Sequence, residues 1–269
     1  MNLLPAALFE HSVTPVQPMA RPRFRFTAWA DFVDCLIEAA LLGTFMVAAC
    51  AATVLLEHPD FPFHHWIPQA GHRRALIGAA MGLTAVGLIY SRGGQRSGAH
   101  FNPAVTLTFY RLGRIGGGKA IGYAVAQSAG AIVGVELAQA IFGLRLAHPA
   151  VAFVVTVPGA AGTAVAFAAE LLISFLLMES VLRLSVGRAR YLTGWCCGLL
   201  VALYITFEAP LSGMSMNPAR TLGSAVVADL WTACWIYFVA PPLGMLLAAE
   251  LHLRRHHGGG LQEESSHVV

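Results

Sequence analysis

The sequence contains little charge. Asp, Glu, Lys and Arg make up 12% of its 269 residues, whereas apolar residues make up 57% and the mean hydropathy is +0.64. Soluble domains carry about 25% charged residues, so this chain has too little charge to cover a water-facing surface. The composition therefore predicts a membrane-spanning protein instead of one or two soluble domains.

The sequence also lacks the patterns that carry catalysis or cofactor binding. The five cysteines form no CxxC pair and have no ligand spacing with histidine, so we expect buried thiols. No Ser-His-Asp set or pair of carboxylates stands out, and the Gly-rich stretch 111–119 lacks the spacing of a phosphate-binding loop. We therefore expect no enzyme, no cofactor, no metal and no nucleic-acid partner.

Four histidines in the connection 57–74 leave a metal site open as an alternative. Two of them are adjacent, the connection is rich in proline, and no thiol or carboxylate pair joins them. This pattern favours a solvated lid on the outer side.

Long apolar runs dominate what remains. Six of them approach the ~20 residues that cross a bilayer core, and two are about half as long. The full runs cover 32–56, 75–91, 118–142, 162–182, 191–208 and 231–253, and the short ones cover 103–113 and 218–228. We therefore predict an all-α membrane protein with six spans and two half-spans, flanked by a flexible tail at 1–27 and a disordered tail at 256–269.

Lys and Arg are distributed unevenly about these spans. One side carries 13 of them and the other carries 3, which by the positive-inside rule predicts two cytoplasmic termini in a multi-pass protein of the plasma membrane. The first group is Arg21, Arg23, Arg25, Arg92, Arg96, Arg111, Arg114, Lys119, Arg183, Arg188, Arg190, Arg254 and Arg255, and the second is Arg73, Arg74 and Arg145.

The chain repeats itself. "ALLGTF" at 40–45 resembles "ELLISF" at 170–175, and each opens a unit of three spans and one half-span. Because three is odd, the second unit enters the membrane from the opposite side. We expect a channel-like domain at 28–255 built of inverted repeats at about 28–145 and 160–255.

Two polar phrases, "SGAHFNPAVTL" at 97–107 and "SGMSMNPARTL" at 212–222, contain two of the three asparagines in the chain. Asparagine is a preferred N-cap and proline a preferred first helical residue. Asn102 and Asn217 should therefore cap half-helices that begin at Pro103 and Pro218. Non-helical backbone at membrane depth must line a watery cavity or lie buried in protein, so the stretches before each asparagine should line a pore.

The two half-helices should point their N-termini at each other, each with a partial positive charge of about half a unit. Together with the amide groups of Asn102 and Asn217, which can both donate to one water molecule, these ends would exclude cations and protons. Arg220 should line the same aqueous path, because an unpaired arginine is costly in a membrane. A salt bridge to Glu170 is the alternative.

These two phrases, with "AELLISF" and "WIYFVAPPLG" at 235–244, resemble the aquaporin or major intrinsic protein family over about 30–253. The resemblance implies an hourglass fold in membrane lipid, a homotetramer with one pore per subunit, and passive permeation of water or small neutral solutes.

The resemblance also implies the pore residues by position. The constriction would be formed by Met81 (or its neighbour Gly82), Ile205, Met214 and Arg220, and Glu170 would brace the second loop. The first repeat has Ala40 at the corresponding place, and Glu38 lies two residues away on another helical face, so the residue that braces the first loop stays open. The paired motifs would be Asn102, Pro103, Ala104, Asn217, Pro218 and Ala219, and the pore-lining loops would contain Gly98, Ala99, His100, Phe101, Gly213, Ser215 and Met216.

The solute is less sharply predicted. Strict water channels resemble Phe and His where this chain has Met81 and Ile205, which suggests a wider, apolar wall that passes glycerol, urea or hydrogen peroxide. Thr221, Ala225, Tyr237 and Phe238 instead resemble water channels. We expect water with small uncharged solutes, and a solute-preferring aquaglyceroporin is the alternative.

Two other classes remain as alternatives. An ion-coupled transporter would need carboxylates that face the cavity, and a purely structural membrane protein would not need the donors of Asn102, Asn217 and Arg220. The carboxylates available for ion coupling are Glu38, Glu136, Glu170 and Glu179.

Overall fold

The computed structural model describes residues 29–185 and 188–265, with side chains as far as 255. Within these ranges the chain forms helices and no strand. The long helices are α1 (Trp29–Glu57), α3 (Ala70–Tyr90), α6 (Gly117–Phe142), α8 (Thr163–Leu184), α9 (Thr193–Phe207) and α12 (Trp235–Ser265). The shorter ones are α2 (Pro62–Trp66), α4 (Arg92–Ser97), α5 (Pro103–Arg111), α7 (Leu144–Ala147), α10 (Ala209–Ser212) and α11 (Pro218–Ala228), with 3-10 turns at Ala152–Val154 and Arg188–Leu192.

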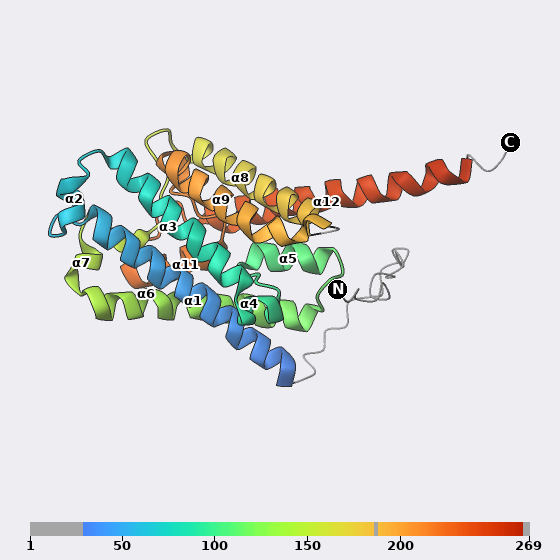
Figure 1. Ribbon diagram of the computed structural model, residues 1–269, viewed down its shortest axis with the longest axis horizontal. Helices are drawn as coiled ribbons and strands as arrows, with labels where there is room; N and C mark the ends of the chain where they lie inside the picture. The colour runs from blue at the N-terminus through green and yellow to red at the C-terminus, as the bar shows by residue number, and fades with distance from the viewer. Residues whose placement is uncertain (1–28, 186–187, 266–269) are drawn as a thin grey trace, which may run out of the picture.

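The six predicted spans correspond to the six long helices, and the two half-spans correspond to α5 and α11 (Figure 1). By length and apolarity, five of the described helices could cross a membrane on their own. The sixth predicted span, α3, is 21 residues long but is not among them. Its first turns carry His72, Arg73 and Arg74, which lower its mean hydropathy.

The structure describes part of one of the two predicted tails. The predicted tail at 1–27 lies outside the described residues. At the other end, the backbone of α12 remains helical through Ser265 and extends beyond the bundle (Figure 1), so the prediction of disorder from 256 is wrong for 256–265. No proline interrupts this segment, and an existing helix adds one hydrogen bond for each residue it orders.

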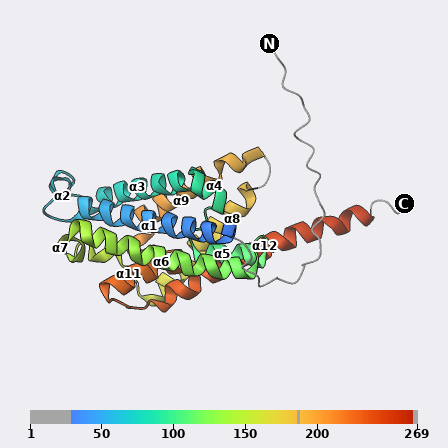
Figure 2. The ribbon, with the colours of Figure 1, turned by 90° about the horizontal axis from the view of Figure 1, so that it is seen from below.

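The helices pack as two related units. In the first unit α1 lies along α6, and in the second α8 lies along α12. Each half-helix packs on the last helix of the other unit, α5 on α12 and α11 on α6, while α3 meets α9 between the units. Figures 1 and 2 show α5 and α11 in opposite halves of the bundle, the arrangement predicted for an inverted repeat.

Glycines allow these helices to approach closely. A Cβ added at Gly130 of α6 would lie 2.1 Å from the carbonyl oxygen of Ala39, and one added at Gly244 of α12 would lie 2.3 Å from that of Leu171. These crossings place Ala39 and Leu171 at equivalent positions of the two units. Gly82 and Gly198 form a third crossing between α3 and α9, where each added Cβ would meet the other's carbonyl oxygen at 2.4 and 2.6 Å.

The cysteines are less uniformly buried than expected. Cys35, Cys50 and Cys197 are buried, but Cys196 and Cys234 are partly exposed, so the prediction of five buried thiols is wrong for two of them.

We predict that Gly130→Ala lowers stability although alanine is the better helix former. The added methyl group would meet backbone atoms, which cannot rotate aside as a side chain can. We expect this overpacking to cost about 1–3 kcal/mol. Gly87→Ala on α3 is the matched control, because an added Cβ there meets no heavy atom within 4 Å. Thermal unfolding in detergent should show a lower Tm for Gly130→Ala only. Equal midpoints for the two variants would contradict the close crossing.

Candidate functional site

Both half-helices begin with a capped asparagine. Asn102 Oδ1 accepts a hydrogen bond from the Ala104 N–H at 2.8 Å, and Asn217 Oδ1 accepts from the N–H groups of Ala219 and Arg220 at 3.1 and 3.2 Å. Proline follows each cap in the first helical turn. The helix starts predicted from the two Asn-Pro pairs are confirmed.

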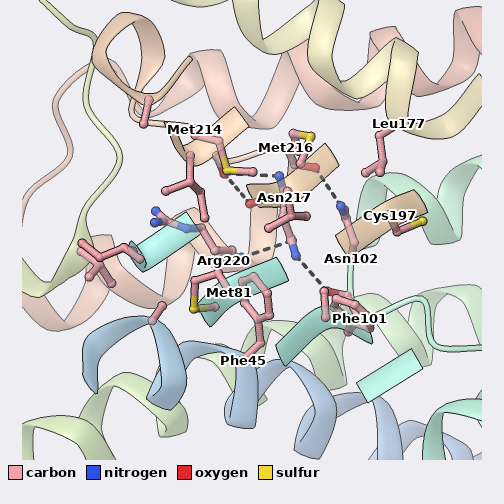
Figure 3. Close-up of a pocket in the computed structure, with 18 of the residues that line it drawn as sticks. Phe45, Met81, Phe101, Asn102, Leu177, Cys197, Met214, Met216, Asn217 and Arg220 are labelled. Carbon is pink, nitrogen blue, oxygen red and sulfur yellow. Dashed lines mark hydrogen bonds between the residues drawn. The ribbon is translucent and has the colours of Figure 1, made fainter. Parts of the chain in front are cut away.

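The two asparagines also bond across the interface between the units (Figure 3). Asn102 Nδ2 donates to the carbonyl oxygen of Met216 at 2.7 Å, and Asn217 Nδ2 donates to that of Phe101 at 2.8 Å. An amide NH₂ group has two protons. One proton of each asparagine NH₂ group is thus committed to the opposite loop. This corrects the expectation that the whole NH₂ group of each asparagine is free to donate into the pore.

The loops before the asparagines have unusual backbone conformations. In each loop, three of the four residues before the asparagine have positive φ angles. Non-glycine residues at such angles cost about 1–3 kcal/mol each and persist only where surrounding contacts hold them. The φ angles are 97° and 83° at Gly98 and Gly213, 51° at Ala99 and Met214, and 28° and 53° at Phe101 and Met216.

Glu170 braces the second loop, as the sequence predicts. Its carboxylate is fully buried and accepts from the Ser212 hydroxyl at 2.9 Å and from the N–H groups of Ser215 and Met216 at 2.6 and 2.8 Å. The sequence left open what braces the first loop, and the structure assigns this role to Glu38. Glu38 accepts there from the Ser97 hydroxyl at 2.6 Å, from the His100 N–H at 3.0 Å and from the Phe101 N–H.

Glu38 was set aside because of the register in which the two repeats were matched. Matching "ALLGTF" with "ELLISF" set Ala40 against Glu170, whereas the glycine crossings set Ala39 against Leu171, and therefore Glu38 against Glu170. Aligning the acidic residues instead of the apolar letters would have found this brace.

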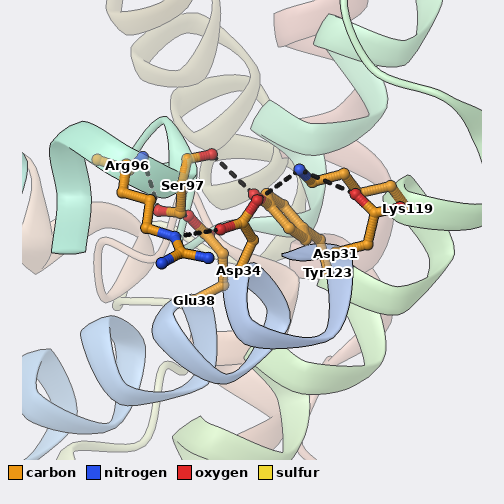
Figure 4. Close-up of polar contacts among 8 residues, drawn as sticks. Asp31, Asp34, Glu38, Arg96, Ser97, Lys119 and Tyr123 are labelled. Carbon is orange, nitrogen blue, oxygen red and sulfur yellow. Dashed lines mark hydrogen bonds and ion pairs between the residues drawn. The ribbon is translucent and has the colours of Figure 1, made fainter. Parts of the chain in front are cut away.

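Sequence reasoning also missed the side chains that hydrogen-bond to the loops and to Glu38. Tyr123 donates to the carbonyl oxygen of Ser97 at 2.8 Å, and Tyr237 donates to that of Ser212. Gln127 donates to Glu38 at 2.8 Å. Figure 4 shows the first brace beside an ion cluster in which Asp34 accepts from Arg96 at 2.9 Å and Lys119 at 2.7 Å.

One cavity brings the predicted pore residues together. Both loops and both asparagines line it, and so do all four residues of the predicted constriction: Met81, Ile205, Met214 and Arg220. Gly82, the alternative to Met81, instead packs against α9. Ala104 and Ala219 are buried and, with the two prolines, do not line the cavity. Their contribution is to start and pack the half-helices.

The cavity has chemically different walls. The loops supply backbone groups and the asparagine amides, whereas α3 and α9 supply mostly aliphatic and sulfur-containing side chains, together with Arg74 and Thr193. The cavity-lining residues from these two helices include Ile77, Met81, Ala85, Ile89, Cys197, Val201 and Ile205.

Arg220 lies on the cavity without a counter-ion. Its Nη1 is buried and has no hydrogen-bond partner among the described residues. The oxygens of Glu170 accept from the second loop, and this carboxylate acts on Arg220 through its charge without a direct ion pair between the two. The salt-bridge alternative is therefore not supported, and the guanidinium remains able to donate into the cavity.

His100 is a buried histidine of the first loop. Its Nδ1 lies 3.1 Å from the Thr106 hydroxyl, and its ring stacks on Phe109 with centroids 4.8 Å apart. These contacts favour a packing role.

The histidines of the outer connection do not gather into a ligand set. His58 Nδ1 accepts from the Asp60 N–H at 3.1 Å, and its ring packs on His148 at 4.5 Å. Within the described ranges no three His, Cys, Asp or Glu side chains are placed to hold a metal ion.

Carboxylates are nearly absent from the cavity wall. Among its described lining residues Glu57 is the one carboxylate, and it forms an ion pair with Arg73 at 2.9 Å. Glu179 pairs with Arg183 at 2.6 Å, and Glu136 lies on the exposed face of α6. None of the four candidates for ion coupling faces the cavity.

Comparisons with known proteins agree with this geometry. The family model for the major intrinsic protein matches residues 28–252. The chain is 34% identical over 220 residues to aquaporin NIP1-3 of Oryza sativa subsp. japonica, covering 79% of this chain and 71% of the relative. It is 35% identical over 217 residues to glycerol uptake facilitator protein-like 6 of Lactiplantibacillus plantarum, covering 78% and 93%.

A solved structure shares the fold. The X-ray structure of the aquaglyceroporin from Plasmodium falciparum superposes with a TM-score of 0.68 at 21% identity, covering 82% of this chain and 95% of that one. With the matched family model extending over most of the chain, and with two half-helices that meet through their capping asparagines, this protein belongs to the major intrinsic protein family.

Proposed function

We propose that the protein is a passive channel for water and small uncharged solutes that excludes protons and ions. The observation that carries this proposal is the meeting of two capped half-helix N-termini on one cavity, beside the unpaired guanidinium of Arg220. Relatives are named as aquaporins and as a glycerol uptake facilitator-like protein, which supports the same class of solute.

Charge exclusion follows from the direction of the half-helices. Each N-terminus carries about half a positive charge, and both point at the centre of the chain's cavity. The uncommitted N–H groups of Asn102 and Asn217 can donate together to one water oxygen. A water held in this way cannot accept a proton from its neighbour, so a hydrogen-bonded file of water is interrupted there.

The apolar wall determines which solutes can pass. Met81, Ile205 and Met214 offer no hydrogen bond from their side chains, and methionine adapts its shape readily. A polyol or urea can place its polar groups toward the loops and Arg220 and its carbon side toward this wall. We therefore propose that glycerol, urea and hydrogen peroxide pass with water.

An ion-coupled transporter is disfavoured, because none of its four candidate carboxylates faces the cavity. Glu38 and Glu170 are occupied by backbone N–H groups of the loops. A sealed structural protein would have no use for an arginine that lies on an internal cavity without an ion pair, because such a residue is costly in a membrane.

We further propose that residues 28–255 form the channel domain, that it lies in the plasma membrane with both termini in the cytoplasm, and that four copies assemble. The uneven placement of Lys and Arg supports this orientation. Family resemblance supports the tetramer, and native mass spectrometry from detergent would show four chains in one particle.

We predict that Arg220→Val weakens charge exclusion. A fixed unit charge contributes about 1–4 kcal/mol at 4 Å, so its removal should raise proton and cation leak through reconstituted vesicles by at least about tenfold. Arg145→Val is the matched control, since Arg145 pairs with Asp60 in the outer connections and does not line the cavity. An unchanged leak in Arg220→Val would place this arginine outside the conducting path.

We predict that Ile205→His shifts selectivity toward water. An imidazole adds a hydrogen-bonding group and narrows the apolar wall, which should lower the ratio of glycerol to water permeability by about tenfold. Stopped-flow light scattering on proteoliposomes measures both rates. Ile205→Leu is the control, because it retains an apolar side chain and should leave the ratio nearly unchanged. If the two variants behave alike, polarity at position 205 does not set selectivity.

A further inference from the structure

We propose that Thr156 is a positioning residue for the constriction, and that it acts by holding the first turn of α11, which carries Arg220. Thr156 lies in the connection between α6 and α8, residues 143–162. It belongs to neither polar phrase and does not itself line the cavity. The inference rests on the proposed channel function.

Thr156 is buried and bonds to the second half-helix. Its exposed fraction is 2%, and its hydroxyl oxygen lies 2.8 Å from that of Thr221, which is 1% exposed. The Thr221 hydroxyl lies 2.6 Å from that of Ser215, and Ser215 donates to the carbonyl oxygen of Asn217 at 2.9 Å. Three hydroxyl groups, from the α6–α8 connection, the half-helix and the second loop, thus form one hydrogen-bonded chain.

The number of protons gives this chain a direction. Each hydroxyl group has one proton to donate. Ser215 uses its proton on the carbonyl oxygen of Asn217, so Thr221 donates to Ser215 and Thr156 donates to Thr221. Thr156 is therefore the first donor of the chain, and the Thr221 oxygen would lose a bond if the Thr156 hydroxyl were absent.

The first unit contains the same kind of chain with a different first donor. Thr106 corresponds to Thr221, since each stands four residues after its capping asparagine. Thr106 donates to the carbonyl oxygen of Asn102 at 3.1 Å and accepts from Gln127 Nε2 at 3.2 Å. In the first unit the donor thus comes from the long helix α6.

The equivalent position on α12 cannot supply this donor. Tyr123 of α6 and Tyr237 of α12 hold equivalent places, because each donates to the carbonyl oxygen of the serine that opens its polar phrase. Gln127 stands four residues after Tyr123, about one helical turn away, whereas Pro241 stands four residues after Tyr237. A proline side chain has no hydrogen to donate. In the second unit Thr156 therefore provides the bond that Gln127 provides in the first.

The α6–α8 connection is attached to the second loop at other points as well. The Gly159 N–H donates to the carbonyl oxygen of Leu211 at 2.9 Å. A Cβ added at Gly213 would lie 2.9 Å from both the nitrogen and the oxygen of Val157. Together with the bond from Thr156, these contacts attach the connection before, within and after the second loop.

The turn that precedes Thr156 has a strained backbone. Ala152, Phe153 and Val154 have consecutive positive φ angles of 45°, 51° and 51°. Non-glycine residues keep such angles only where surrounding contacts hold them. Val154 and Val155 line the cavity. The bond made by the next residue, Thr156, thus also holds a part of the cavity wall in place.

The consequence concerns Arg220, the residue before Thr221. Its N–H donates to Asn217 Oδ1 at 3.2 Å, and its guanidinium lies on the cavity with Nη1 unpartnered in the described chain. The backbone of the first turn of α11 therefore sets where this side chain stands. Without the Thr156 hydroxyl that turn would be held less firmly, so the constriction would admit larger solutes and leak protons.

The transport test uses Thr156→Val, which removes the hydroxyl and retains the branched shape. In proteoliposomes the ratio of glycerol to water permeability and the proton leak should each rise about fivefold, the effect of one hydrogen bond of ordinary net strength. Thr156→Ser retains the donor and should give wild-type values. Thr84→Val is the matched control, because the Thr84 hydroxyl donates within α3, to the carbonyl oxygen of Ala80 at 2.8 Å.

A double variant tests whether Thr156 acts through Arg220. When Arg220→Val is already present, adding Thr156→Val should leave the proton leak nearly unchanged, because the position of the arginine no longer matters. A further fivefold rise would show that Thr156 acts independently of Arg220 and would overturn the proposed role.

Hydrogen exchange gives a readout that does not depend on transport. Backbone amides of residues 213–221 should exchange about fivefold faster in Thr156→Val and in Thr156→Ala than in the wild type, because local opening loses one opposing bond. Thr156→Ser should exchange as the wild type does. Wild-type exchange or wild-type selectivity in the variants without a hydroxyl would overturn the role of Thr156. Wild-type vesicles that pass neither water nor glycerol would instead overturn the proposed channel function.

Discussion

Two hydrogen bonds between the units determine the rest of the site. Asn102 donates to the carbonyl oxygen of Met216, and Asn217 donates to that of Phe101, at 2.7 and 2.8 Å. The same asparagine side chains cap their own half-helices through their oxygens. Each half-helix is therefore started by one end of an amide and joined to the other unit by the opposite end, so that the two dipoles cannot separate without breaking both bonds.

The glutamate braces extend this arrangement into the protein. Glu38 accepts from the N–H of Phe101, and Glu170 accepts from that of Met216, the two residues whose carbonyl groups receive the asparagine protons. Both peptide groups are thus satisfied on each side, although their φ angles are positive. Buried backbone groups that lack partners are costly. The braces satisfy the loop backbone on the side that faces the protein, so the other side of each loop can face the cavity.

Sequence reasoning predicted the parts of this site that depend on local chemistry. Asn-Pro marks a helix start wherever it stands, so the starts at Pro103 and Pro218 followed from capping rules. Glu38 was missed because its role depends on which residues of α1 and α6 lie opposite each other, and Gly130 sets that register through its contact with Ala39. The hydroxyl of Tyr123 was missed for the same reason, since its partner at Ser97 is distant in sequence.

The crossing of α3 and α9 has a consequence for the origin of the chain. Gly82 and Gly198 hold corresponding places in the two units, and each lies against the carbonyl oxygen of the other. A surface that meets its own counterpart in this way is self-complementary under a twofold rotation. A polypeptide of half the present length, inserted in both orientations, would already present matching surfaces to a second copy of itself. Gene duplication and fusion would then preserve an existing dimer contact instead of creating a new one.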